Sequence, residues 1–487
     1  MKRLALASVV LAVGCGTTVN LPPTQGQAGS TSGDSGLTIQ QLPQDTTTPS
    51  TTDVPTAGAA KVHTPKDQVV SSATARSVTT SPTPAKTHHV SDGTPIQIGL
   101  ITTGVGNASQ FALNTGQSYS DQAMWSALVA EYNRHGGLDG HHIVPVYGAT
   151  DTASSNWANQ FQSVCARFTQ DNHVQAVIGY IFVFLPSFES CLAKQGVAHL
   201  YGGYQPGDVA DQQQYPTLVS TANPTTDGSL LATLDGGLRS GVLSKSTKLG
   251  LLLDSCADGD RAVSRTVVPW LKAHGITYET VLANCAQGAT DVAGLVTAIG
   301  SAELRFAASG VKVVLGGGVA ELVFMEAAAA QGYRPQYLMS DGGAALEPNA
   351  PRGQLQNVHG FGWLPAVDVN PTHQPYPRTA AQKACLAKLA KHGLQAKKYN
   401  DFLGAYAACD GLDLYAKALA TGATSGREIA TAVAAAESSF AGALTYGGKL
   451  QATARQHGGP GVYRQYAWSA ACSCFTYRGP TYPMPSP

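Results

Sequence analysis

From Pro95 onward, short apolar runs alternate with longer amphipathic segments, and this alternation restricts the possible folds more than any other feature of the sequence. The short runs have the length of buried strands, whereas the longer segments repeat their apolar residues with the helical period. Strands that alternate with helices form βαβ units, in which the strands are parallel. We therefore expect an α/β domain with parallel sheets.

The alternation predicts both strands and helices along the whole of this region. The expected strands are Ile96–Ile101, His142–Tyr147, Ala176–Ile178, Ala198–Tyr201, Thr217–Ser220, Leu249–Leu253, Ile276–Leu282, Val311–Leu315, Gln336–Met339 and Val358–Phe361. The expected helices are Ser120–His135, Thr152–Thr169, Thr225–Arg239, Asp260–His274, Asp291–Ala308, Glu321–Gln331 and Tyr406–Ala420. Roughly 390 residues are too many for one core of ordinary size, so we expect two lobes.

The first fifteen residues are typical of an export signal. Lys2 and Arg3 precede the largely apolar run Leu4–Val13, which is too short to span a bilayer. The small residues before Cys15 resemble a bacterial lipobox, in which the cysteine is lipidated and becomes the mature N-terminus. The alternative is an ordinary secretory signal cleaved near Cys15. Either interpretation predicts an exported chain, and the lipobox predicts one anchored to the cell membrane within the bacterial envelope.

Residues 16–94 are rich in Thr, Ser, Pro, Gly and Gln and contain few large apolar side chains. Such a segment buries too little apolar surface to offset its ordering entropy, so a disordered tether is predicted. With roughly 80 flexible residues, its root-mean-square reach would be about 50 Å. That length would hold a folded domain away from its anchor.

The charge balance argues against a polyanionic partner. Lys+Arg and Asp+Glu both total 31, and charged residues make up only 13% of the chain. Binding to nucleic acid needs clustered positive charge, so no nucleic-acid partner is expected. Beyond the export signal, no stretch of the sequence reaches the roughly 18 apolar residues of a membrane helix.

Eight cysteines remain when Cys15 is set aside, an even number that indicates disulfides in an exported protein. Sequence order suggests that neighbours pair, although spacing alone leaves other connectivities open. The neighbours are Cys165 with Cys191, Cys256 with Cys285, and Cys385 with Cys409, which leaves Cys472 and Cys474. The thiols are not interleaved with histidines at zinc-site spacing, so disulfides are favoured over a metal.

The most specific motif of the chain is Glu131-Tyr132-Asn133-x-x-Gly136-Gly137-Leu138-x-Gly140. It describes a helix end followed by a glycine-rich turn into a strand. It resembles a turn of the type I periplasmic binding proteins, in particular the branched-chain amino acid binding proteins of ABC transporters. Further segments resemble that family in the same order over about residues 95–480: Ile96–Leu100 with Thr103-Gly104, Asp151, Val174–Gly179, Val311–Gly318, Leu338–Gly342 and Ala405–Ala420.

The resemblance implies two Rossmann-like lobes with parallel-sheet cores, joined by interlobe crossovers of which Leu338–Gly342 is the second. Lobe 1 would comprise about 95–221 and 343–445, and lobe 2 about 222–342 and 446–480. Proteins of this family close on a small solute and deliver it to an ABC transporter permease. We therefore expect a monomeric, membrane-anchored capture protein.

Ligands of open parallel sheets bind beyond the carboxyl ends of the strands. The candidate ligand contacts are accordingly Phe182, Val183, Tyr201, Gly202, Tyr204, Asp254, Gly317, Asp341 and Trp363. The family usually has small hydroxyl residues, which bind the ligand's carboxylate, where this chain has Ile181–Phe184. The difference favours a solute with a larger apolar or aromatic body. Asp254 and Asp341 would bind an amine. Each candidate also has a structural interpretation, because aromatic rings pack beneath loops and aspartates cap turns and helices.

Two other functions stay open beside solute capture for transport. A ligand-sensing receptor module would have the same fold without transport. An exported amidase or hydrolase would need a nucleophile with a positioned base, but the sequence has no Gly-x-Ser-x-Gly, His-Glu-x-x-His or P-loop motif. Gly104-Val105-Gly106 lacks the third glycine of a dinucleotide loop, and the adjacent His141 and His142 would point to opposite faces of a strand. We expect neither an enzyme nor a cofactor.

Overall fold

The computed structural model describes residues 92–103, 116–179, 181–203, 205–316, 318–373, 378–437, 439–446 and 457–486. The predictions for the export signal with Cys15 and for nearly all of the tether fall outside these residues. So do the predicted ligand contacts Tyr204 and Gly317.

Five parallel strands form the first sheet. In their order across the sheet they are β2 (Ile143–Thr150), β1 (Ile96–Thr103), β3 (Ala176–Gly179), β4 (Ala198–Tyr201) and β5 (Leu218–Ser220). β3 and β4 are buried along their whole length, as is usual for parallel strands covered on both faces. The sequence predicted all five strands.

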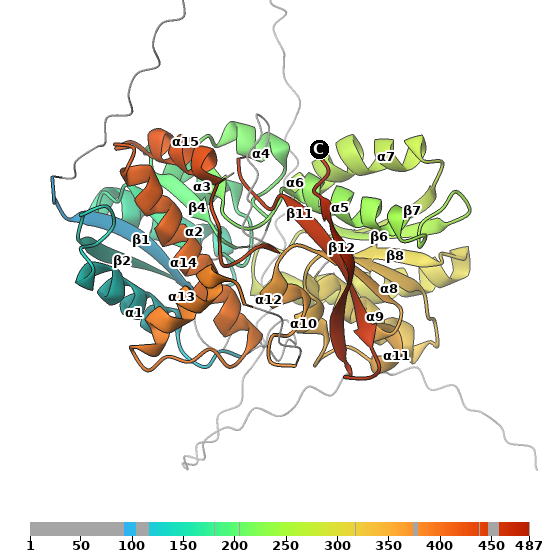
Figure 1. Ribbon diagram of the computed structural model, residues 1–487. Coiled ribbons are helices and arrows are strands. Elements are labelled where there is room, and N and C mark those ends of the chain that lie inside the picture. The colour runs from blue at the N-terminus through green and yellow to red at the C-terminus, as the bar shows by residue number, and fades with distance from the viewer. Residues whose placement is uncertain are drawn as a thin grey trace, which may run out of the picture. The chain divides into compact units, whose positions relative to one another are not determined.

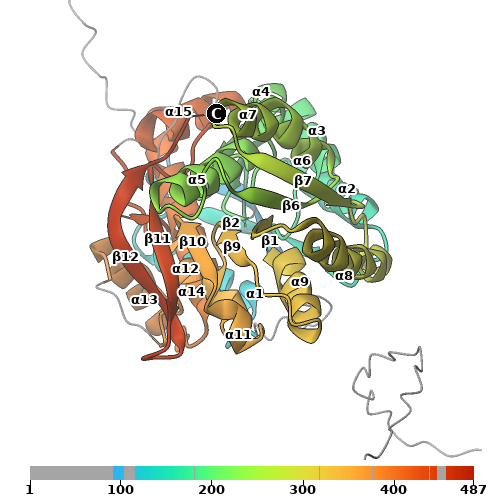
Figure 2. The same cartoon turned by 90° about the vertical axis from the view of Figure 1, so that its right-hand side faces the viewer.

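Seven strands form the second sheet. In order they are β12 (Cys474–Pro483), β11 (Val462–Ser469), β10 (Val358–Gly362), β9 (Gln336–Met339), β8 (Val313–Gly316), β6 (Lys248–Asp254) and β7 (Thr277–Ala283). β6 to β10 are parallel and were predicted, whereas β11 is antiparallel to both β10 and β12. Figure 2 shows this antiparallel pair beside β10 at the edge of the sheet.

The antiparallel pair was not predicted, because β12 contains an irregularity in its middle. The pairing runs from Arg464 with Thr481 to Gln465 with Arg478, so Gly479 and Pro480 of β12 are skipped. A Gly-Pro dipeptide is a turn signal, and extra residues in one strand break the period of two on which strand prediction depends.

Helices pack on both sheets (Figure 1). They are α1 (Asp121–Arg134), α2 (Trp157–Ala166), α3 (Pro186–Lys194), α4 (Val209–Gln214), α5 (Thr226–Arg239), α6 (Ala257–Ala262), α7 (Val268–Ala273), α8 (Val292–Ser309), α9 (Gly318–Ala330), α10 (Gly343–Leu346), α11 (Arg352–Leu355), α12 (Pro365–Asp368), α13 (Ala380–Ala390), α14 (Tyr399–Leu419) and α15 (Gly426–Glu437). Every predicted helix has a counterpart, although the expected helix Asp260–His274 is divided by a π-helical turn at Val263–Val267. α3, α4, α10, α11, α12, α13 and α15 were not predicted.

The chain changes sheets after β5, returns after β10 and changes again between α15 and β11. α14 packs on β3 and β4, α15 packs on β4 and β5, and α13 contacts α1 and α14, so α13–α15 belong with the first sheet (Figure 1). The second crossing was expected at Leu338–Gly342. Because β10 is hydrogen-bonded to β9, the chain instead stays in the second sheet until Gly362. Residues 343–362, which were expected in lobe 1, thus belong with the second sheet.

We use lobe 1 for the first sheet with α1–α4 and α13–α15, and lobe 2 for the second sheet with α5–α11.

The motif Glu131–Gly140, at the end of α1, forms the glycine-rich turn that the sequence indicates. Gly137 has a φ of 80°, and a Cβ there would lie 1.9 Å from the carbonyl oxygen of His141, so only glycine fits. Asn133 accepts a hydrogen bond from the amide of Ile143 at 2.7 Å and donates to its carbonyl at 2.9 Å. These two bonds tie the end of α1 to the start of β2.

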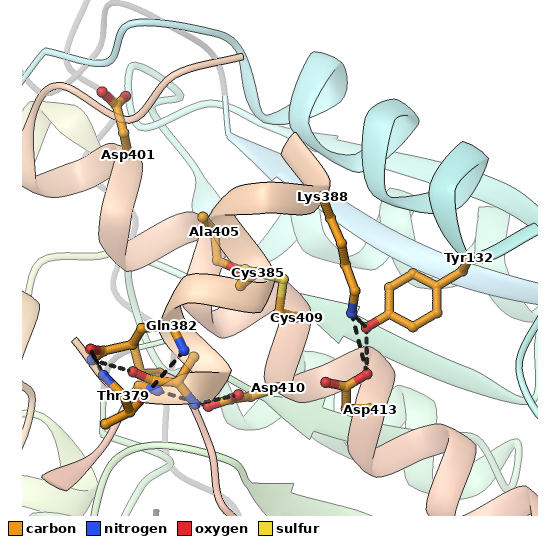
Figure 3. Close-up of a disulfide and its surroundings, with 12 residues drawn as sticks. Tyr132, Thr379, Gln382, Cys385, Lys388, Asp401, Ala405, Cys409, Asp410 and Asp413 are labelled. Carbon is orange, nitrogen blue, oxygen red and sulfur yellow. Dashed lines mark hydrogen bonds and ion pairs between the residues drawn. A yellow bond between two sulfur atoms is a disulfide. The ribbon is translucent and has the colours of Figure 1, made fainter. Parts of the chain in front are cut away.

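Four disulfides stabilise the two lobes: Cys165–Cys191, Cys256–Cys285, Cys385–Cys409 and Cys472–Cys474. The first three are the pairs that sequence order suggested, and the fourth joins the remaining two cysteines. Cys385–Cys409 connects α13 to α14 (Figure 3). Beside it, Lys388 donates to the hydroxyl of Tyr132 at 2.7 Å, and this hydroxyl donates to Asp413 at 2.5 Å. Together these contacts hold α1, α13 and α14 in one layer.

Candidate functional site

The candidate site consists of the segments that follow the carboxyl ends of the parallel strands. These ends are Thr103, Thr150, Gly179, Tyr201 and Ser220 in lobe 1, and Asp254, Ala283, Gly316, Met339 and Gly362 in lobe 2. Parallel strands place their carboxyl ends at one edge of each sheet, where ligands of open α/β sheets bind. We call them the lobe 1 edge and the lobe 2 edge.

The segments at the two edges contact each other. The amide of Trp157, after β2, donates to the carbonyl of Gln287, after β7, at 3.0 Å, and the amide of Ala289 donates to the carbonyl of Ser154 at 2.9 Å. A Cβ at Gly288 would lie 2.0 Å from the carbonyl oxygen of Ser155, so the approach is too close for a side chain. The lobe 1 edge therefore faces the lobe 2 edge.

The three crossings between the lobes are hydrogen-bonded to one another. In the first crossing, Asn223 accepts from the indole N–H of Trp363 at 2.6 Å and donates to the carbonyl of Gly203. Ser220 donates through its hydroxyl to the carbonyl of Asn223 at 2.6 Å and through its amide to the carbonyl of His457 at 2.8 Å. Trp363 belongs to the second crossing and His457 to the third. Such a junction can serve as the hinge of a two-lobed protein.

A buried ion-pair network also joins the lobes. Arg261 of α6 donates to Asp208 at 2.6 and 3.1 Å and to Asp211 of α4 at 2.7 Å. Burial raises the pKa of Asp211 to about 7, and the negative charge of Asp208 adds to this effect. Burial acts in the same direction on Asp208, but the hydrogen bonds from Arg261 and from the amide of Asp211, together with the positive charge of Arg261, outweigh it and lower the pKa of that carboxyl. One guanidinium thus compensates two acids.

At the lobe 1 edge, the predicted contacts are mainly apolar. Phe182 is half-buried, with its ring centroid 5.4 Å from Trp157 and 6.0 Å from Phe161. Val183 is also half-buried and packs against the same core cluster. Tyr201 is fully buried, and its ring lies 5.2 Å from His199. Phe182 and Val183 therefore offer apolar surface, whereas Tyr201 lies beneath it.

Gly202 is buried behind this surface. A Cβ at Gly202 would lie 3.2 Å from the Cβ of Ala407 on α14 and 3.3 Å from the hydroxyl of Thr221. A larger residue would therefore press on the packing between β4 and α14.

At the lobe 2 edge, the predicted contacts are polar or structural. Asp341 is partly exposed and accepts a hydrogen bond from the hydroxyl of Ser340 at 3.2 Å. Burial raises the pKa of Asp341 to about 6. Trp363 is fully buried at the junction of the crossings. Asp254 ends β6, but its side chain is outside the described part of the structure.

Two acids at the lobe 2 edge were missed by sequence reasoning. Glu321, in the first turn of α9, has an exposed fraction of 0%, and neither carboxylate oxygen has a hydrogen-bond partner among the described residues. Asp368, in α12, is equally buried and accepts at Oδ2 from the hydroxyls of Tyr446 and Tyr477 at 2.9 and 3.3 Å. Burial raises the pKa of both acids well above the usual range, and for Asp368 the charge of Asp341 contributes. A useful signal would have been the occurrence of an acid after each of three neighbouring strands.

Within the described ranges, no group of three or more His, Cys, Asp or Glu side chains is placed to hold a metal ion. The helices in those ranges also do not include one with the length and apolarity needed to cross a bilayer.

Comparison with known proteins identifies the fold. No family model matches the chain, and no curated protein matches its sequence. Solved structures do match. A solute-binding protein of an ABC transporter from Rhodopseudomonas palustris in complex with p-hydroxybenzoic acid superposes with a TM-score of 0.57 at 17% identity, covering 80% of this chain and 97% of that one.

Two further matches are branched-chain amino acid binding proteins. LivJ from Streptococcus pneumoniae, in complex with isoleucine, has a TM-score of 0.54 at 18% identity and covers 79% of this chain and 100% of its own. The leucine-binding protein LivK from Thermotoga maritima has a TM-score of 0.55 at 14% identity, with coverages of 79% and 98%. The chain described here has the type I periplasmic binding protein fold, which confirms the fold class expected from the sequence.

Proposed function

We propose, from this type I periplasmic binding protein fold, that the chain captures a small solute between its lobe edges and delivers it to an ABC transporter permease. One observation carries the proposal: the parallel strands of the two sheets face each other with their carboxyl ends, and the crossings converge on a hydrogen-bonded junction at Asn223. Two such lobes can open and close around a ligand while the junction bends.

The proposed solute makes apolar contact with lobe 1 and polar contact with lobe 2. Phe182 and Val183 would contact its apolar or aromatic part, and Asp341 would contact its polar part. Tyr204, Asp254 and Gly317 follow the same strand ends in the sequence and belong to the proposed site. Tyr201, Gly202 and Trp363 would support the site from behind, because the structure buries them.

We also propose that the chain is exported and anchored through a lipidated Cys15, with residues 16–94 as its tether. Four disulfides are consistent with an oxidising compartment outside the cytoplasm. A lipidation assay in a bacterial host would test the anchor. Radiolabelled palmitate should be incorporated into the wild type but not into a Cys15→Ala variant.

A catalytic function has less support in the geometry. The described residues include a buried histidine–carboxylate pair, in which Nδ1 of His199 lies 2.9 Å from Glu189. Both side chains are almost completely buried, and the rings of Phe188 and Tyr201 pack against the imidazole. A substrate has no access to this pair, so it does not have the exposed geometry of a general base.

The proposal is tested by a thermal-shift screen of the oxidised chain against amino acids, amides, aromatic acids, amines and sugars. A solute at 100 times its Kd should stabilise the protein by about 2.7 kcal/mol. A saturable shift without turnover of the compound supports solute capture, whereas consumption of the compound would indicate an enzyme. Uptake of the bound compound by cells with and without the gene then separates transport from the alternative, a sensing receptor of the same fold.

A further inference from the structure

One of the four disulfides differs from the others in what it connects. Three of them join residues that are 24, 26 or 29 positions apart, whereas Cys472 and Cys474 are separated by 2 positions. A disulfide stabilises a fold mainly by closing a loop in the unfolded chain, and the effect grows with the length of that loop. The Cys472–Cys474 bond therefore stabilises the fold least of the four, and its presence calls for another explanation.

This disulfide lies in the turn between β11 and β12. Cys474 is the first residue of β12 and pairs with Ser469, the last residue of β11, so residues 470–473 form the turn. Figure 1 shows the turn at the end of the hairpin away from the C-terminus. Residues 470–472 are exposed, and the turn consists of two alanines, Cys472 and Ser473. Only small side chains thus surround the disulfide within the turn.

The two sulfur atoms of this disulfide differ in accessibility. Cys472 is exposed, whereas Cys474 has an exposed fraction of 1%. Each cysteine of the three other disulfides is buried or half-buried. Exposed disulfides are the ones that external thiols reduce most readily. An incoming thiolate can therefore reach Cys472, and Cys474 is then the sulfur that it displaces.

The residue between the two cysteines has an unusual backbone conformation. Ser473 has a φ of 51°, which lies in the left-handed region that residues with a Cβ avoid. Glycine adopts this region without steric cost, and glycines hold most of the positive-φ positions in the described ranges. Opening the disulfide would free Ser473 to leave this region. The backbone therefore acts against the closed bond.

Cys474 is followed by a residue that packs on α10. Phe475 is fully buried, and its amide donates to the carboxylate of Glu347 at 3.2 Å. A Cβ at Gly343 would lie 3.2 Å from the ring of Phe475. Gly343 begins α10, and Glu347 caps its end. The residue next to the disulfide thus contacts both ends of this helix.

A second contact reaches the loop between β9 and α10. The ring centroid of Phe475 lies 5.5 Å from that of Tyr466 in β11. Tyr466 donates through its hydroxyl to the carbonyl of Ser340 at 2.6 Å. Ser340 precedes Asp341, the proposed solute contact of lobe 2. A change in the hairpin turn can therefore reach this loop through a continuous chain of packed side chains.

We propose that Cys472–Cys474 is an exchange site for a low-molecular-weight thiol, and that its redox state controls the order of the loop that carries Asp341. In the oxidised state, β12 holds Phe475 against α10 and Tyr466. In the reduced state the turn relaxes, and the loop loses this support. The exchange itself is independent of solute capture, whereas its consequence for a solute rests on the proposed function.

The reaction consumes two thiols and transfers two electrons to the protein. The first thiolate attacks the Sγ of Cys472 and forms a mixed disulfide, while the bond to Cys474 breaks and its electron pair leaves with Cys474, which takes a proton from water. A second thiolate attacks the sulfur of the bound thiol and releases Cys472 as a thiolate. The two thiols leave as their disulfide, and both cysteines are reduced.

The first experiment is graded reduction of the full oxidised chain in mixtures of reduced and oxidised glutathione. Free thiols are alkylated with N-ethylmaleimide and located by peptide mass spectrometry. Cys472 and Cys474 should become reduced with about tenfold less reduced glutathione than any other pair. Alkylation should occur at Cys472 before Cys474, because Cys474 is buried. The far-UV circular dichroism should not change, since the three longer disulfides stay closed.

Ser473→Gly and Ser473→Ala are a matched pair of variants for the backbone argument. Glycine removes the steric cost of the left-handed conformation, whereas alanine keeps it. Ser473→Gly should therefore need about threefold to tenfold more reduced glutathione for half-reduction than the wild type. Ser473→Ala should match the wild type. Equal behaviour of the two variants would contradict a role of the backbone in opening the bond.

Hydrogen exchange measures the effect on the loop without any solute. We compare the oxidised protein with the form alkylated at Cys472 and Cys474. Peptides that cover residues 338–347 should exchange about fivefold faster in the alkylated form, whereas peptides of α1 in lobe 1 should not change. The double variant Cys472→Ser/Cys474→Ser has no alkyl groups and should show the same fast exchange in oxidising and reducing buffer.

Three outcomes would overturn the proposal. If Cys472–Cys474 resists glutathione as strongly as the other disulfides, the exchange site is wrong. If only dithiothreitol opens it, a small monothiol is not its partner. If the bond opens but residues 338–347 exchange at the same rate, control of the loop is wrong. None of these results depends on solute binding, so a failure of solute capture in the thermal-shift screen would be recognised separately.

Discussion

Asp208 and Asp211 in lobe 1 share one arginine, whereas Glu321 and Asp341 in lobe 2 share no cation in the described structure. Both pairs lie in segments that follow parallel strands at the facing edges. In the first pair, Arg261 crosses from lobe 2 and binds both carboxylates. The same fold can therefore compensate buried acids by a contact between lobes. It leaves Glu321 without such a partner among the described residues.

Loss of Arg261, which pairs with Asp208 and Asp211, should destabilise the protein most. Arg261→Gln should lower the free energy of unfolding by about 3 kcal/mol at pH 8, because two buried carboxylates lose their counter-charge. The loss should be smaller at pH 5, where the acids can become protonated. Urea denaturation measures it. Arg265→Gln, an exposed arginine in the turn between α6 and α7, is the control and should cost little; equal losses in both variants would contradict the special role of Arg261.

The second prediction concerns the pH dependence of the same pair. Burial raises the pKa of Asp211 to about 7, whereas an aspartate in an unfolded chain titrates near 4. Between these values the native state binds more protons than the unfolded state, so stability falls as pH rises. We expect a fall of about 2 kcal/mol from pH 5 to pH 7 that Asp211→Asn removes. Parallel stability curves for the two proteins would show that Asp211 does not titrate in this range.

Removal of Glu321, the uncompensated acid, should raise the stability of the protein instead of lowering it. Glu321→Leu should raise the free energy of unfolding by about 1–2 kcal/mol, because an apolar side chain replaces a buried carboxyl group without partners. The gain should be larger at pH 8 than at pH 5, since the raised pKa of Glu321 makes its ionisation unfavourable in the folded state.

Glu131→Leu provides the contrast for this experiment. Glu131 is almost as buried as Glu321 but pairs with Arg134 at 2.7 Å and with Lys391. Its replacement should therefore destabilise the protein. A loss of stability in both variants would mean that Glu321 has partners that stabilise the folded state.

The smallest expected change concerns the pH dependence of solute binding at Asp341. Burial raises the pKa of Asp341 to about 6, so only about a tenth of this carboxyl is ionised at pH 5 and about nine tenths at pH 7. If Asp341 binds an ammonium group, the affinity for 2-phenylethylamine should rise about tenfold over this range. Titration calorimetry of the wild type and Asp341→Asn measures it. An equally steep rise in the variant would assign the effect to another group.

The sequence predicted the parallel strands because their signal is local. Most of β1 to β10 are short, largely apolar runs bounded by turn residues or a helix, although β7 includes Glu279. The Asn133 and Gly137 turn was also evident, since its residues are needed by the backbone whatever the rest of the fold does. The pair β11 and β12 was missed because Gly479 and Pro480, which the pairing skips, give β12 the signal of a turn.

The candidate site could be predicted only in part, because the sequence indicates where the strands end but not what covers those ends. Placing candidates after strand ends led to Phe182, Val183 and Asp341, which the structure leaves at least partly exposed at the two edges. The same rule also selected Tyr201 and Trp363, which are fully buried. The exposed fraction of a residue at a strand end depends on which helix or crossing covers it, and Trp363 is covered by Asn223, which lies far away in the sequence.

By itself the sequence determined the α/β class and the order of the parallel strands along the chain, because these follow from periodicity. The tertiary structure alone decided that Arg261 meets Asp208 and Asp211, and that Glu321 meets no cation among the described residues. Whether a carboxyl group is compensated depends on side chains brought together from different elements and lobes, and such contacts leave no pattern in the sequence around the acid itself.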